Sequence, residues 1–120
     1  MALGNHILLE CYGCDADLLK NEIKMEQILT DAAKNAHASV LHTYFHKFEQ
    51  GEGITGIIAL AESHISVHTW PEHNYMAIDV FMCGDCNPLD SISYINQKVL
   101  MTHSIQREIV RGVEFTSTYK

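Results

Sequence analysis

Apolar and polar residues alternate most clearly between residues 75 and 83. Met76, Ile78, Val80 and Met82 fall on one side of an extended chain there, and Cys83 belongs to the other side. This pattern predicts a strand with one buried face. Shorter apolar runs, bounded by turn residues, predict further strands over residues 5–12, 39–48, 54–60, 63–69 and 104–115.

Apolar residues recur at helical spacing in two other segments. The first, residues 16–35, follows Asp15, a residue type that caps helices. Its expected buried stripe is Leu18, Leu19, Ile23, Ile28, Leu29, Ala32 and Ala33. The second begins at residues 87–90, where a capping Asn, a Pro and an acidic residue are typical of a helix start. Its expected stripe is Leu89, Ile92, Ile95 and Val99.

The resulting order, β-α-β-β-β-β-α-β, predicts an α+β fold. We expect a two-layer α/β sandwich, with a mostly antiparallel sheet that has its helices on one face. The face without helices carries Cys83. A length of 120 residues and a hydrophobic fraction of 47% predict a single domain, residues 1–120. A domain of this size buries only about two-thirds of its extended surface, so pairing of two chains is expected.

The charge balance argues against nucleic-acid binding. Eight Lys and Arg residues stand against 15 Asp and Glu, for a formal net charge of −7, and the basic residues form no patch. No apolar run is long enough for a transmembrane helix, and the start of the sequence lacks the pattern of a secretory signal. We therefore expect a cytoplasmic location, no membrane partner and reduced cysteines.

Two CxxC pairs, Cys11 with Cys14 and Cys83 with Cys86, could form a zinc site from four thiolates. The pairs lie much further apart than the roughly 15–20 residues of typical zinc modules. His64 and His68 share a strand face, but about 13 Å separates them along it, too far to chelate one ion. We expect no metal, and a non-enzymatic zinc-binding module remains the remote alternative.

The most informative segment contains Glu62-Ser63-His64, then His68-Thr69-Trp70-Pro71-Glu72, and is followed by residues 77–84, AIDVFMCG. It resembles the short bacterial, archaeal and viral S-adenosylmethionine decarboxylases. Residues 3–6, 45–48 and 53–56 also resemble that family, and the resemblance weakens only after about residue 87. Members are pyruvoyl-dependent enzymes of spermidine biosynthesis, which convert S-adenosylmethionine to its decarboxylated form.

The resemblance implies that the cofactor, a pyruvoyl group, forms from Ser63. The Ser63 hydroxyl attacks the Glu62 carbonyl to give an ester, and loss of the Ser63 α-proton then expels the Glu62 carboxylate. Hydrolysis leaves a pyruvoyl group and ammonia, and the chain becomes two, residues 1–62 (β chain) and 63–120 (α chain). By the same resemblance His68 is the proton acceptor in processing, and Thr55 matches an assisting hydroxyl residue that is usually Ser.

The resemblance also implies roles in turnover. The pyruvoyl carbonyl forms a Schiff base with the substrate amine, and Cys83 matches the proton donor that acts after carbon dioxide leaves. Glu72 matches the residue that binds the ribose hydroxyls, with capping of a turn as its structural alternative. Phe48 matches an aromatic that stacks on adenine, with core packing as its alternative. Trp70 and Tyr75 either line the pocket or pack.

Three questions stay open at this stage. Pyruvoyl-dependent arginine or ornithine decarboxylases share the Ser63, His68 and Cys83 set, so the substrate has these alternatives. Family members pair two protomers with active sites near the interface, so we expect a homodimer of cleaved protomers. Finally, an odd separation puts Ser63 and His68 on opposite faces of a regular strand. Either the strand bends between them, or the cleavage site lies just outside it.

Overall fold

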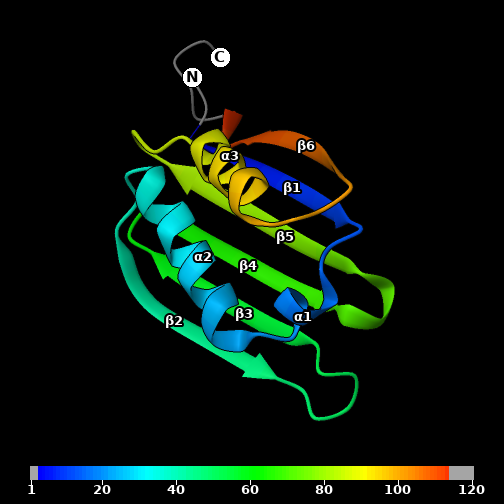
Figure 1. Ribbon diagram of the computed structural model, residues 1–120. Coiled ribbons are helices and arrows are strands. Elements are labelled where there is room, and N and C mark those ends of the chain that lie inside the picture. The colour runs from blue at the N-terminus through cyan, green and yellow to red at the C-terminus, as the bar shows by residue number, and fades with distance from the viewer. Residues whose placement is uncertain (1–2, 114–120) are drawn as a thin grey trace.

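A computed structural model describes residues 3–113. Figure 1 shows one sheet whose helices all lie in front of the same face. In chain order the elements are β1 (Gly4–Tyr12), α1 (Ala16–Leu19), α2 (Glu22–Asn35), β2 (Val40–Lys47), β3 (Ile54–Leu60), β4 (Ser63–Trp70), the 3₁₀ turn η1 (Pro71–His73), β5 (Tyr75–Cys83), α3 (Pro88–Lys98) and β6 (His103–Arg111).

The six strands form one sheet in the order β2-β3-β4-β5-β1-β6. All five strand pairings are antiparallel. The predicted α+β sandwich is therefore confirmed, and the bounds predicted for β3 and β5 are those observed. The last predicted strand is shorter than expected, since β6 ends at Arg111, and residues 114 and 115 of that prediction lie outside the described residues.

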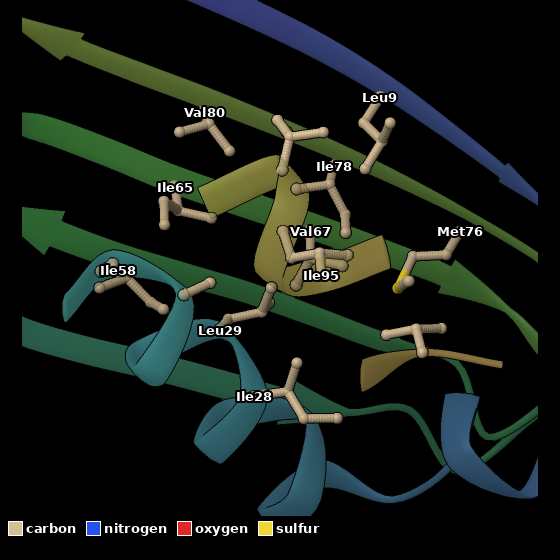
Figure 2. Close-up of a cluster of buried hydrophobic side chains, with 14 of the residues drawn as sticks. Leu9, Ile28, Leu29, Ile58, Ile65, Val67, Met76, Ile78, Val80 and Ile95 are labelled. Carbon is tan, nitrogen blue, oxygen red and sulfur yellow. The ribbon is translucent and has the colours of Figure 1, made fainter. Parts of the chain in front are cut away.

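The core lies between the sheet and helices α2 and α3. The even-numbered residues of β5, which are Met76, Ile78, Val80 and Met82, are all buried, as their alternation predicts. Figure 2 shows Ile28 and Leu29 of α2 and Ile95 of α3 directed at Ile58, Ile65 and Val67 of the sheet. This burial is the main source of the free energy that holds the helices to one face.

The first predicted helix is wrong in one respect, because it is two helices. Helix α1 ends at Leu19, and Asn21 caps α2 by accepting a hydrogen bond from the Lys24 N–H at 3.0 Å. An Asn side chain that bonds a backbone N–H favours the start of a new helix over continuation of the first one, so α2 runs in a new direction. The stripe consequently shifts, so that Met25 is buried while Ile23, predicted to be in the core, is 83% exposed.

The sheet face turned away from the helices, here called the open face, is covered by no element among residues 3–113. It carries apolar side chains that remain accessible, notably Tyr44 of β2, Ile57 of β3 and Ile109 of β6, each between 47% and 58% exposed. A hollow of about 420 Å³ lies on this face between His68 and Asp79. Within the described residues, no helix is long and apolar enough to cross a membrane.

Thr69 is a buried polar link between the sheet and α1, and it gives a test of the fold. Its hydroxyl accepts from the Ile54 N–H at 2.9 Å and donates to the Leu19 carbonyl at 2.8 Å. Replacing the hydroxyl by a methyl group leaves both backbone groups without this partner. We expect Thr69→Val to lower the free energy of unfolding by about 1–3 kcal/mol, measured by urea denaturation.

The matched control is Thr30→Val, because the Thr30 hydroxyl bonds the Gln27 carbonyl at an exposed position on α2. That change should alter stability by less than about 0.5 kcal/mol. Equal effects of the two substitutions would show that the buried link contributes nothing specific.

Candidate active site

The bond between Glu62 and Ser63 lies where a tight turn meets a strand. Leu60 of β3 pairs with Ser63 of β4, so only residues 61 and 62 form the hairpin turn between them. Ser39 anchors this turn from the side, since its N–H donates to the Glu62 carboxylate at 3.0 Å and its carbonyl accepts from the Ala61 N–H at 2.9 Å. The turn is therefore held by the segment just before β2 as well as by its own strands.

Ser63 carries the strain of this turn. Two-residue hairpins favour positive φ at their central residues, which Gly and Asn supply readily. Here those residues are Ala61 and Glu62, and neither has a positive φ; Ser63 instead has φ of 148°. A serine in that region stores conformational energy of about 1–3 kcal/mol. The strain sits at the bond that the sequence predicts will break, at the first residue of β4.

Cys83 holds the carbonyl of the same bond. The Cys83 backbone N–H and its thiol both donate to the Glu62 carbonyl oxygen, each at 3.0 Å. The β4–β5 register, in which Ser63 pairs with Met82, fixes this contact. Two donors aimed at one carbonyl oxygen stabilise negative charge that develops there when a nucleophile attacks. The predicted cleavage bond and the predicted proton donor are thus in direct contact.

A hydrogen-bonded network that the sequence pattern did not predict lies beside Ser63. Asp79 of β5 accepts at one oxygen from His6 Nε2 at 3.0 Å, and His64 Nε2 lies 3.4 Å from the same oxygen. Its other oxygen accepts from the Ser66 hydroxyl. On its far side, His64 Nδ1 is 3.4 Å from Ser63 Oγ. The residues Glu62, Ser63, His64, Asp79 and Cys83 are called the cleavage end below.

His68 and Thr55 meet at the other end of the open face. Thr55 Oγ1 is 2.7 Å from His68 Nδ1, because these residues are paired across β3 and β4. Aromatic rings surround the imidazole, with Trp70 at 4.2 Å and the 43% exposed Phe48 at 6.2 Å between ring centroids. Glu72 follows on η1 and is exposed. The residues Phe48, Thr55, His68, Trp70 and Glu72 are called the aromatic end below.

Trp70 and Tyr75 pack on one another and also line a hollow. Their ring centroids are 5.2 Å apart, and Tyr12 and His73 join them around a space of about 410 Å³. The Tyr75 hydroxyl donates to Glu10. Burial, together with this carboxylate, raises the pKa of Tyr75 above its ordinary value, so the phenol stays protonated and can act as a donor.

The two ends are well separated within one chain. His68 lies five residue steps along the strand from Ser63, a length of roughly 16 Å. His68 shares the open face with Ser66 and Asp79, but it does not reach Ser63. The first alternative from the sequence, a strand that bends to unite these residues, is therefore wrong. The second placed the cleavage site just outside the strand; Glu62 lies outside β4 but Ser63 is its first residue, and cleavage between them stays a prediction.

The four thiols do not form one site. Cys11 pairs opposite Met76, whereas Cys83 pairs opposite Gly4, seven positions further along β1. Cys11 and Cys14 are buried, and their mutual hydrogen bond together with burial raises the pKa of Cys11. Burial also raises the pKa of Cys86. The zinc-module alternative is therefore contradicted by the geometry.

His6, His64 and Asp79 are the described residues that could hold a metal ion, since their ligand atoms lie within 4.8 Å of one another. Hydrogen bonding already accounts for this cluster. Arg111 approaches His6 Nδ1 at 3.5 Å as a donor, which leaves the proton of a neutral imidazole on Nε2, facing Asp79. A nitrogen that carries a proton toward a carboxylate is not a free metal ligand.

Comparisons with known proteins point to one family. The family model for S-adenosylmethionine decarboxylase matches residues 5–112. An S-adenosylmethionine decarboxylase proenzyme of Acetivibrio thermocellus is 44% identical over 113 residues, covering 93% of this chain and 90% of that protein. A proenzyme of the same name from Clostridium kluyveri is 46% identical over 112 residues, covering 92% of this chain and 88% of that protein.

A solved structure gives the same result for the fold. The crystal structure of the adenosylmethionine decarboxylase of Aquifex aeolicus superimposes with a TM-score of 0.84 and 34% sequence identity, over 92% of each chain. The similarity thus covers both ends of the open face and the strained turn between β3 and β4. The chain belongs to the S-adenosylmethionine decarboxylase family, as the motifs around Ser63 and His68 predict.

Proposed function

We propose that this protein cleaves its own chain between Glu62 and Ser63 and then decarboxylates S-adenosylmethionine. The observation that carries the proposal is the pair of Cys83 donors on the carbonyl of a bond whose serine has φ of 148°. The names of the relatives support S-adenosylmethionine as substrate over arginine or ornithine, and the word proenzyme in those names supports self-cleavage.

Self-cleavage requires attack by Ser63 Oγ on the Glu62 carbonyl carbon. Strain at Ser63 raises the energy of the intact peptide, and the Cys83 N–H and thiol stabilise the oxyanion that forms. The Ser63 α-proton must then leave for the Glu62 carboxylate to be expelled. We assign that proton to His68, whose Nδ1 is oriented by the Thr55 hydroxyl.

The geometry around Ser63 fits formation of a pyruvoyl group. Cleavage at Glu62 turns Ser63 into the start of a new chain, residues 63–120, next to the Cys83 thiol. The pyruvoyl group supplies the electron sink that amino-acid decarboxylation needs and that no side chain provides. Before cleavage the thiol donates to Glu62, and afterwards it is free to donate its proton to the substrate carbon that has lost carbon dioxide.

The aromatic end suits the nucleoside part of the substrate. Phe48 presents an exposed ring on which adenine can stack, and Glu72 presents an exposed carboxylate that can accept from two ribose hydroxyls. A sulfonium cation gains from nearby aromatic faces, which Trp70 and Phe48 offer. The formal charge of −7 favours the approach of a cationic substrate.

We further propose that the working unit is a homodimer in which the two open faces meet. Within one chain, roughly 16 Å of strand separates Ser63 from His68, too far for direct proton transfer. A two-fold arrangement of open faces can bring the aromatic end of one protomer to the cleavage end of the other. The exposed side chains of Tyr44, Ile57 and Ile109 then become buried, which favours this contact.

We infer that the dimer works in the cytoplasm. All four cysteines are free thiols, and Cys83 acts in this account as a thiol, which a reducing compartment preserves.

A mixing experiment tests the shared site. Ser63→Ala keeps His68 but has no nucleophile, while His68→Ala keeps Ser63 but lacks the proton acceptor. Each variant alone should stay unprocessed. When the two are co-expressed with different tags and the mixed dimer is purified, we expect the His68→Ala chain to be cut and the Ser63→Ala chain to remain whole, as judged by intact mass.

The matched control replaces Ser63→Ala by the double variant Ser63→Ala, His68→Ala. This partner pairs but supplies no imidazole, so it should not restore cutting. A mixed dimer of the two single variants that remains entirely uncut would contradict the shared site.

Cys83 should separate processing from turnover. Cys83→Ala keeps the backbone N–H on Glu62 and loses only the thiol, a weak donor, so self-cleavage should slow by no more than about 10-fold. Decarboxylation by the cleaved protein should fall at least about 100-fold, because its proton donor is missing. Release of labelled carbon dioxide from S-adenosylmethionine measures this rate. Cys86→Ala is the control and should retain both activities; an active Cys83→Ala enzyme would refute the assignment.

A further inference from the structure

The side chain nearest to the Ser63 hydroxyl with basic character is His64, not His68. Ser63 Oγ lies 3.4 Å from His64 Nδ1, and His64 Nε2 lies 3.4 Å from Asp79 Oδ1. A serine, an imidazole and a carboxylate therefore stand in line, with the imidazole between the two oxygens. This is the order of groups that activates a serine nucleophile in acyl transfer. Both contacts are long, as such contacts often are before a reaction begins.

Asp79 determines which nitrogen of His64 is basic. His64 Nε2 faces the Asp79 carboxylate at an ion-pair distance of 3.4 Å, and the negative charge there favours the tautomer of the neutral imidazole that carries its proton on Nε2. The lone pair then resides on Nδ1, which faces Ser63 Oγ. His6 and Ser66 also donate to Asp79 and fix the direction of its carboxylate. Each member of the network thus supports the tautomer that makes Nδ1 a base.

We propose that His64 is the general base for the first step of self-cleavage and that Asp79 is its positioning residue. His64 Nδ1 takes the proton from Ser63 Oγ as the oxygen forms a bond to the Glu62 carbonyl carbon. The bond from that carbon to the Ser63 nitrogen breaks, and the proton passes from His64 to this nitrogen, which leaves as an amine. The product is an ester with no net gain or loss of atoms, and Cys83 stabilises the oxyanion between the two states.

This inference rests on the proposed self-cleavage and divides it between two histidines. His64 acts on the hydroxyl proton and forms the ester, whereas His68 acts later on the Ser63 α-proton. The position of each ring fits its step, since His64 contacts Ser63 within the chain and His68 belongs to the distant aromatic end. Substitution of His64 should therefore stop the chain as an intact peptide, whereas substitution of His68 should stop it as the ester.

Hydroxylamine distinguishes these states, because it cleaves an ester under conditions that leave a peptide bond intact. We expect His64→Gln to slow self-cleavage at least about 100-fold and to accumulate a chain that hydroxylamine does not cut. His68→Ala should accumulate a chain that hydroxylamine cuts at residue 62. The Ser63→Ala chain should neither cleave itself nor be cut by hydroxylamine. A wild-type chain that never cleaves itself would refute the proposed function rather than the role of His64.

Two further variants separate a chemical role from a structural one. Asp79→Asn should slow ester formation at least about 10-fold, yet the fraction that does cleave should decarboxylate substrate at the wild-type rate per cleaved chain. His6→Gln removes one donor to Asp79 but leaves both Asp79 and His64 in place, so it should slow ester formation by less than Asp79→Asn does.

Circular dichroism and thermal melting check that each variant folds. If His64→Gln does not fold, chemical rescue of His64→Ala by imidazole gives a second test of the base. In His64→Ala, added imidazole should restore cleavage in proportion to its concentration. A folded His64→Gln chain that cuts at the wild-type rate, or that stops as a hydroxylamine-sensitive ester, overturns the proposal. So does a folded His64→Ala chain that imidazole leaves unchanged.

Discussion

The contact between Cys83 and the Glu62 carbonyl is the interaction on which the site depends. It exists because β4 and β5 run antiparallel in a register that places Cys83 opposite the end of a two-residue turn. The same turn contains no residue suited to positive φ, so the unusual φ of 148° falls on Ser63. A single piece of sheet geometry therefore supplies both the oxyanion donors and the strain that the proposed attack on the peptide requires.

A second constraint comes from the length of a strand. One residue advances the chain by about 3.3 Å, so a motif that is compact in sequence, from Ser63 to Glu72, is extended in space. Residues that the family motif joins are consequently split between two ends of the open face. This separation is the reason for the proposed dimer, in which a second copy buries the accessible apolar side chains of that face and supplies the missing end of the site.

Local pattern was sufficient for much of the fold. Period-two alternation identified β5 and the face that carries Cys83, and the Asn-Pro start identified α3. The break before Asn21 was missed because the apolar spacing continues across it, which made Ile23 look buried. Asp79 was missed for another reason. A carboxylate on an alternating strand resembles an ordinary solvent-facing residue, and its partner His6 is 73 residues away in sequence.

Self-cleavage of the wild-type protein is the most direct test of the account. Freshly purified protein should be incubated and its intact mass followed over time. The account predicts that the chain of 120 residues gives way to fragments 1–62 and 63–120. It also predicts that the second fragment is lighter by one ammonia than a serine-ended chain and reacts with a carbonyl reagent. An uncut chain after prolonged incubation, or a second fragment that still begins with serine, would contradict it.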